Sequence, residues 1–172
     1  MRADPTSELS DGVLVSRARE GNRVAFEQLY RRHARRIAGL VYRLLASDNE
    51  LDELVQETFL AAYEGLDRLR EPERFGSWLR SIAVHNVRQK IARRRRWRNV
   101  LERLTVPTTV EPGLGEAAQS LAQLPPELRM PFVLHKLDGY TVEETASLCR
   151  ISKATAKRRC AEASKRLARR MS

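Results

Sequence analysis

Apolar side chains recur along the chain at the three- and four-residue spacing of amphipathic α-helices, with polar side chains between them. The clearest stretch follows Asn22, a residue type that caps helix N-termini, and Gly21 suits the end of a shorter helix capped by Asp11. The apolar face of the longer helix is predicted to hold Phe26, Leu29, Tyr30, Ile37, Leu40, Val41, Leu44 and Leu45. His33 falls near this face, which favours a packed histidine over a metal ligand.

A second amphipathic stretch begins after the polar break at residues 47–49. Its predicted buried residues are Leu51, Leu54, Val55, Phe59, Ala62, Tyr63 and Leu66. Residues 68–75 include Pro72 and mixed charges and are expected to form a loop. Another helix follows from about Gly76 and runs into the basic residues 93–96. Together these patterns predict a helical bundle over residues 11–98, preceded by an N-terminal tail over 1–10.

Beyond this bundle the helical periodicity fails, and proline, glycine and threonine gather between residues 105 and 116. This composition is typical of a flexible linker, which we expect over residues 99–119. Residues 120–172 are predicted to form a second helical unit, in which Pro125 and Pro126 suit a helix start. Pro131 is unfavourable inside a helix and indicates that the regular part begins close to it.

The end of the chain has the pattern of a helix-turn-helix. Thr141 with Glu144 forms a capping-box pattern that opens a short helix, and residues 149–152 make a turn. Ser152 then caps a longer basic helix that is expected to run to about residue 169 and to turn Ala156 and Cys160 inward. The predicted fold class is therefore all-α: an N-terminal helical bundle, a flexible linker and a C-terminal helix-turn-helix.

Charge is unevenly distributed along the chain of 172 residues, whose 32 Lys+Arg and 22 Asp+Glu give a net charge of +10. Residues 48–57 hold five acids and no base, residues 88–98 hold seven bases and no acid, and residues 150–170 hold nine bases and one acid. The basic excess predicts a polyanionic partner. Its segregation predicts two anion-binding surfaces and an acidic surface for a different partner, with solvated helix faces as the alternative.

Several classes of protein are disfavoured by features that the sequence lacks. It has no apolar run that could span a membrane and no signal peptide pattern, so we expect a cytoplasmic protein without membrane insertion. Cys149 and Cys160 match no disulfide framework. The three histidines are scattered, no glycine-rich phosphate loop is present, and the acids near Asp52 spread over too wide an arc for a metal cage. We therefore expect no catalysis, no cofactor and no metal.

The order and spacing of three segments resemble a known family. Residues 52–63 are close to a signature acidic helix, residues 75–83 match the opening of a promoter-melting helix, and residues 124–146 match a region-four motif. By these segments the chain resembles the small extracytoplasmic-function (ECF) sigma factors, which keep only sigma regions two and four. It differs from the usual pattern at His85, Gln89, Arg150 and Ala156, where the family often has Asn, Asp, Gly and Val.

The resemblance implies a role for each charged surface. The residues expected to bind core RNA polymerase are Asp52, Glu53, Gln56 and Glu57. The residues expected at the minus-ten element, where the loop before the fourth helix captures a flipped base, are Arg68, Arg70, Arg74, Phe75, Arg80, His85, Asn86, Arg88 and Gln89. Those expected at the minus-thirty-five element are Ser152, Lys153, Thr155, Lys157, Arg158 and Arg159.

The function implied is that of a sigma factor, which binds core polymerase, directs it to specific promoters and assists promoter melting. Its expected partners are bacterial core RNA polymerase and promoter DNA, and an anti-sigma factor is left open. Two alternatives stay open from the residues alone. One is a stand-alone helix-turn-helix regulator whose N-terminal bundle dimerises, and the other is a hydrolase with an acidic metal site.

Overall fold

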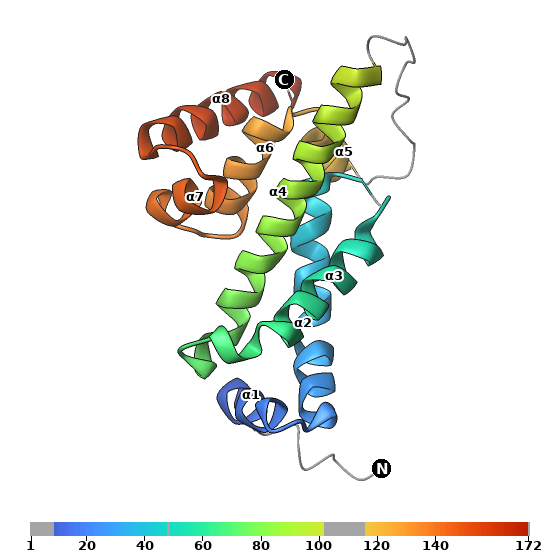
Figure 1. Cartoon of the computed structure of the whole chain (residues 1–172). Coiled ribbons are helices and arrows are strands. Elements are labelled where there is room, and N and C mark those ends of the chain that lie inside the picture. The colour runs from blue at the N-terminus through green and yellow to red at the C-terminus, as the bar shows by residue number, and fades with distance from the viewer. Residues whose placement is uncertain (1–8, 48, 102–115, 172) are drawn as a thin grey trace.

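A computed structural model describes residues 9–47, 49–101 and 116–171. These residues form helices joined by turns, with no β-strand among them, which confirms the all-α prediction (Figure 1). The helices are α1 (Asp11–Arg19), α2 (Arg23–Leu45), α3 (Leu51–Glu64), α4 (Phe75–Leu101), α5 (Glu116–Ala122), α6 (Pro126–Phe132), α7 (Val142–Cys149) and α8 (Lys153–Met171). Of the linker predicted over residues 99–119, residues 102–115 lie outside the described residues, whereas 99–101 continue α4 and 116–119 belong to α5.

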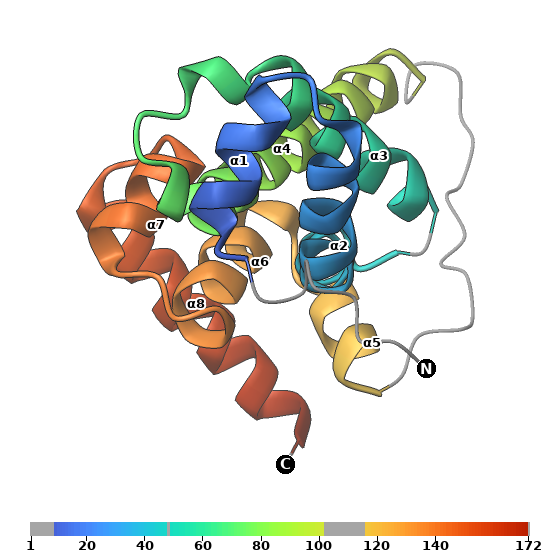
Figure 2. The ribbon, with the colours of Figure 1, turned by 90° about the horizontal axis from the view of Figure 1, so that it is seen from below.

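The long helix α4 lies at the centre of the molecule. Helices α2 and α3 pack along one side of it, and α6, α7 and α8 lie on the other side (Figures 1 and 2). Leu29 and Leu44 of α2, Leu54 of α3 and Leu79 of α4 are fully or almost fully buried, as the helical spacing predicts. The apolar faces of these helices therefore meet in one core, which α1 covers at one end.

The helix starts follow the sequence closely, with some differences. The Asn22 side chain accepts a hydrogen bond from the Ala25 amide at 3.1 Å, which confirms it as the cap of α2. The cap of α1 is Ser10 rather than Asp11, because the Ser10 hydroxyl reaches the Val13 amide. The residue before α3 is Glu50, which has a left-handed backbone (φ 67°) and makes no side-chain cap. Glu50 therefore starts α3 without giving it a side-chain cap.

Two short 3₁₀ turns, Leu66–Arg68 and Pro72–Arg74, join α3 to α4, and the first begins two residues before the loop predicted over 68–75. Helix α4 then begins at Phe75, one residue earlier than expected. At its other end it continues to Leu101, beyond the predicted end of the bundle at residue 98. The segment before α4 is thus a compact connection with regular hydrogen bonding rather than an open loop.

The C-terminal unit confirms the capping predictions but not the interpretation of Pro131. Thr141 and Glu144 form the reciprocal capping box of α7, and the Ser152 hydroxyl accepts from the Thr155 amide at 3.1 Å. Pro131 lies inside α6, which starts at Pro126. Pro131 is the sixth residue of α6 and has no amide to donate within the helix, and burial of Pro131 and of the neighbouring Met130 offsets this loss. A π-helical turn, Val133–Leu137, then leads towards α7.

None of the helices in the described part of the chain is long and apolar enough to cross a membrane.

Candidate functional site

The four residues predicted to bind polymerase lie on one exposed face of α3. Leu54, Val55, Thr58 and Phe59 of the same helix are buried. Because residues one and two positions apart point to different sides of a helix, Asp52, Glu53, Gln56 and Glu57 project into solvent. Asp52, Gln56 and Glu57 make no side-chain hydrogen bond or ion pair with the other described residues. The structure therefore brings these residues together and leaves three of them available to a partner.

The acidic cluster is partly neutralised by the basic half of α4. Lys90 Nζ lies 2.9 Å from Glu50 Oε1 and 3.2 Å from Glu53 Oε2, and Arg94 also pairs with Glu50. Hydrogen bonding to the Glu50 carboxylate raises the pKa of Lys90 above its ordinary value. Glu50 and Glu53, two of the five acids noted in the sequence, thus hold the start of α3 against α4. A third acid, Asp48, lies outside the described residues.

Three of the arginines predicted for the minus-ten element lie on the connection between α3 and α4. Arg68, Arg70 and Arg74 are exposed, and Arg74 pairs with Glu71 at 2.9 Å. Phe75 is different, because it is fully buried, with its ring centroid 5.4 Å from that of His33. It lies in the core under the connection, whereas the three arginines lie on the surface.

The remaining residues predicted for the minus-ten element divide between two faces of α4. Arg80 lies over the Tyr140 ring at 5.5 Å, and Arg88 Nη1 donates to the Leu148 carbonyl at 3.0 Å. Both arginines thus contact the C-terminal unit. Asn86 faces the other way, with its amide 3.4 Å from the Thr58 hydroxyl of α3.

His85 lies between Arg88 and Gln89 and completes this polar group. Its Nδ1 is 3.2 Å from Arg88 Nη2, and its Nε2 is 2.6 Å from the Gln89 side-chain amide. Burial, together with the positive charges of Arg88 and Arg150, lowers the pKa of His85 below its ordinary value. Burial likewise lowers the pKa of Arg88 below its ordinary value.

The helix-turn-helix presents an exposed basic face at the start of α8. Ala156, Cys160 and Ala163 are buried, which confirms the inward orientation of the first two. Lys157 and Arg158 point outward, and Lys153 is exposed while paired with Glu143 at 3.0 Å. The other predicted residues of this set are exposed or half-buried: Ser152, Thr155 and Arg159.

The turn of this motif depends on an unusual backbone at Arg150. Its φ of 54° and ψ of 50° lie in the left-handed region, where glycine is favoured. Arg150 therefore adopts a conformation that glycine reaches more readily, and the turn forms without a glycine.

Sequence reasoning missed the polar residues that join the two helical units. Arg129 is buried and donates from Nε to the Leu44 carbonyl at 2.9 Å. Arg43 of α2 pairs with Asp138, which follows the π-helical turn. The one signal that could have revealed Arg129 is its place between the apolar residues Leu128 and Met130. Over the parts of the chain described, no three His, Cys, Asp or Glu side chains are grouped to hold a metal ion.

The geometry defines a two-unit helical protein with an exposed acidic helix and a basic helix-turn-helix. Two family models match it: Sigma-70 region 2 over residues 29–98, and Sigma-70, region 4 over residues 114–167. The ECF RNA polymerase sigma factor SigM of Mycobacterium tuberculosis is 30% identical over 166 residues, covering 94% of this chain and 85% of the relative. The ECF RNA polymerase sigma-E factor of Escherichia coli is 30% identical over 164 residues, covering 83% and 84%. The chain belongs to the ECF family of RNA polymerase sigma factors.

Solved structures share the fold. CnrH, in complex with the cytosolic domain of CnrY, is 27% identical, with a TM-score of 0.64 over 94% of this chain and 96% of CnrH. The sigma factor RpoE of Bartonella quintana, in complex with the anti-sigma factor NepR, is 20% identical, with a TM-score of 0.66 over 83% and 93%. The arrangement of helices is therefore that of sigma factors.

Proposed function

We propose that this chain is a promoter-specificity subunit that joins core RNA polymerase, directs it to promoters with two separate elements, and assists melting of the DNA. The observation that carries the proposal is the separation of one exposed acidic face from two basic ones. Acidic side chains on α3 would be repelled by DNA and suit a protein surface, whereas basic side chains on α4 and α8 suit phosphates. Family membership supports the same division of roles.

For polymerase binding we assign Asp52, Gln56 and Glu57 as the direct contacts. Glu53 is ion-paired with Lys90, so it contributes both to the acidic surface of α3 and to the packing of α3 on α4. Because the three other side chains have no partner within the described chain, binding costs no internal ion pair.

For the minus-ten element we assign the exposed arginines of the α3–α4 connection and the polar face of α4. Arg68 and Arg70 are exposed and can approach phosphates or a flipped base, and Arg74 would first leave its ion pair with Glu71. Arg80 and Arg88 are held by Tyr140 and by the carbonyl of Leu148, so their use on DNA requires the C-terminal unit to move away. Promoter binding and separation of the two units are therefore coupled.

For the minus-thirty-five element we assign the start of α8, with Lys157 and Arg158 best placed for base edges. On binding DNA, Lys153 would give up its ion pair with Glu143 and contact a phosphate instead. In this scheme residues 11–98 serve polymerase and the minus-ten element, residues 99–119, whose two ends are helical, link the units, and residues 120–172 serve the minus-thirty-five element. The role is non-catalytic and cytoplasmic, where polymerase acts.

CnrH, which is similar over nearly the whole chain, is solved with a second protein bound. Together with RpoE of Bartonella quintana, which is solved with the anti-sigma factor NepR, this supports an anti-sigma partner for the present chain. Such a partner would compete with polymerase or DNA for the same surfaces.

Run-off transcription with purified bacterial core polymerase tests the proposed function. A promoter library with randomised minus-ten and minus-thirty-five elements supplies the templates, so that the cognate sequence is selected by the protein itself. We expect the full-length chain to select a subset of templates and to bind them tightly only together with core polymerase. Tight operator binding by the chain alone, with no transcripts, would instead indicate a stand-alone regulator.

A further inference from the structure

Helix α1 holds the connection between α3 and α4 near its start through a single arginine. Arg19 Nε donates to the Leu66 carbonyl at 3.2 Å, and Arg19 Nη2 donates to the same oxygen at 2.9 Å. Nη2 also donates to the carbonyl of Leu69. The planar guanidinium therefore fixes two backbone carbonyls of the connection relative to each other, which the single ammonium of a lysine does less well.

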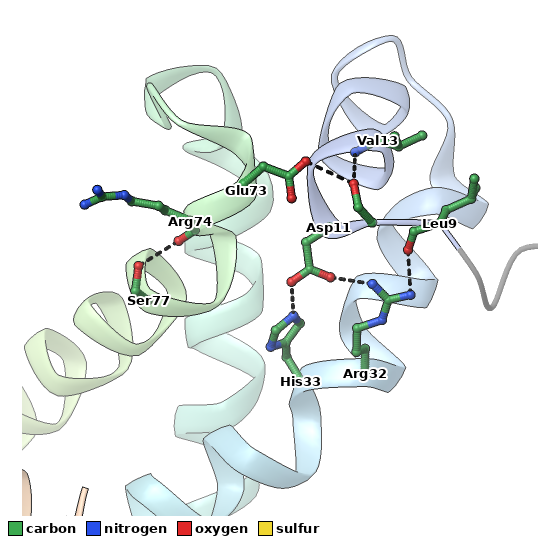
Figure 3. A network of polar contacts seen from close by, with 9 residues as sticks. Leu9, Asp11, Val13, Arg32, His33, Glu73, Arg74 and Ser77 are labelled. Atoms are coloured by element: carbon green, nitrogen blue, oxygen red, sulfur yellow. Dashed lines mark hydrogen bonds and ion pairs between the residues drawn. The ribbon is translucent and has the colours of Figure 1, made fainter. Parts of the chain in front are cut away.

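The other end of α1 holds the same connection near its end (Figure 3). The Ser10 hydroxyl, which caps α1, also donates to Glu73 Oε1 at 3.0 Å. The Glu73 carboxylate lies close to the backbone of α1 at Gly12: a Cβ added at Gly12 would lie 2.0 Å from Glu73 Oε1. Glycine at this position thus leaves room for the Glu73 carboxylate against α1.

A third contact runs from α1 through α2 to the residue where the connection becomes α4. Asp11 Oδ2 lies 2.7 Å from His33 Nε2, and Asp11 Oδ1 accepts from Arg32 at 2.6 Å (Figure 3). The His33 ring in turn meets the buried Phe75 ring edge to face, and a Cβ at Gly76 would lie 3.0 Å from it. Asp11 thereby orients the ring against which Phe75 and Gly76 pack.

These contacts hold the segment that carries Arg68, Arg70 and Arg74. They come from α1, which lies before residue 29, where the match to Sigma-70 region 2 begins. Resting on the proposed function, we propose that α1 sets the shape of the connection that recognises a minus-ten base, and that Arg19 is its main positioning residue. A flexible loop loses conformational entropy when it captures a base, and this loss weakens binding. A loop that is already held in place avoids the loss.

The proposal concerns selectivity rather than folding alone, because Arg19 touches backbone carbonyls of the connection and no part of the predicted DNA surface. Losing its hydrogen bonds frees the backbone between Leu66 and Leu69 while α1 remains packed through Leu14, Val15 and Ala18. The expected defect is therefore poorer discrimination at one promoter position.

The test compares holoenzymes made with the full chain and bacterial core polymerase on a library randomised over both promoter elements, with the transcripts sequenced. We expect Arg19→Gln to lower the preference at one minus-ten position about tenfold, the size of a single base contact. Arg19→Lys should restore part of it. Preferences at the minus-thirty-five element should not change. Arg17→Gln is the matched control, since Arg17 is an exposed arginine of the same helix.

Gly12→Ala provides a second variant that does not depend on Arg19. Alanine favours the helix, but its Cβ must displace the Glu73 carboxylate and break the bond from Ser10. It too should weaken discrimination in the minus-ten element alone. Unchanged preferences in folded variants, or an equal loss at both elements, would overturn the role of α1. Failure of the wild-type chain to initiate at all would instead defeat the proposed function on which this role rests.

Discussion

The guanidinium of Arg129 in α6 donates a hydrogen bond to the main-chain carbonyl of Leu44, the penultimate residue of α2, over 2.9 Å. The carbonyls at a helix end lack partners within the helix, so a buried cation is favourable there. The same side chain also reaches the carbonyls of Leu121, Ala122 and Leu124 at 3.3–3.4 Å. One arginine therefore joins the end of α2 to the end of α5 and to the start of the C-terminal unit.

Replacing Arg129 by alanine should destabilise the chain strongly. Burial lowers the pKa of Arg129 to about 10, so the group is still charged at neutral pH and its loss leaves several buried carbonyls without a donor. We expect Arg129→Ala to lower the free energy of unfolding by about 3 kcal/mol in urea denaturation. Arg36→Ala, at an exposed position of α2, should change it by less than about 0.5 kcal/mol. Equal effects of the two variants would contradict a special role for Arg129.

Weakening the contact between the units should increase DNA binding by the chain alone. Arg43 pairs with Asp138 across this contact, yet Arg43 Nε, Asp138 Oδ2, Arg80 Nε and the Tyr140 hydroxyl are buried without a hydrogen-bond partner. A contact with so many unpaired polar atoms costs desolvation and is easily opened.

Arg43→Gln removes a charge from this contact without touching a residue assigned to DNA. We expect the free chain to expand in small-angle scattering and to bind duplex DNA a few-fold more tightly in fluorescence anisotropy, because Arg80 and Arg88 are released. Arg35→Gln, on the exposed face of the same helix, should leave both measurements unchanged. Tighter DNA binding without expansion would indicate another cause.

Charge reversal on the exposed face of α3 should weaken polymerase binding. Because Asp52 has no ion-pair partner among the described residues, Asp52→Lys alters the surface without breaking an internal contact. We expect affinity for core polymerase to fall about tenfold at low salt, and the difference from the wild type to shrink at high salt because the charges are screened. Glu64→Lys, on an outward-facing position at the end of the same helix, is the control. Normal association of Asp52→Lys with polymerase would show that this face has another role.

Acid should destabilise the chain through His85. Its pKa is lowered from 6.5 in the folded state, so below about pH 6.5 the unfolded chain takes up a proton more readily than the folded one. The free energy of unfolding therefore falls as the pH drops from about 6.5 towards the folded-state pKa of His85. Well above about pH 6.5 the His85 ring is neutral in both states, so its ionisation no longer changes stability. Urea denaturation from about pH 7.5 to about pH 5 should show a smaller acid loss for His85→Gln than for the wild type. Identical pH profiles would exclude a contribution from His85.

Much of the local structure followed from patterns short enough to recognise in the sequence. The caps at Asn22, Thr141 and Ser152 were predicted because each bonds to an amide three residues away. The start of α1 was assigned to Asp11 instead of Ser10, since both residue types cap helices and only the backbone distinguishes them. The sequence indicates a helix start close to Pro131, but Pro131 lies inside α6, because its burial, which the sequence pattern does not show, offsets the missing hydrogen bond.

The candidate site was predicted as residue types on helix faces, but not as contacts. The acidic face of α3 and the basic face of α8 were evident because each is formed within one helix. The pairing of Glu50 with Lys90 and the clamp of Arg19 on Leu66 were not, because each joins residues about forty positions apart.

The sequence by itself therefore determined the all-α class, the helix-turn-helix and the segregation of charge, since these depend on local hydrogen bonds and helical periodicity. Only the tertiary structure decided that Phe75 is buried and that Arg88 reaches Leu148, 60 residues later. It likewise decided that Arg129 reaches back 85 residues to Leu44. Such contacts arise only when whole helices pack, and packing makes structural links of Arg129, Arg88 and Arg43 while Arg68 and Arg70 stay exposed.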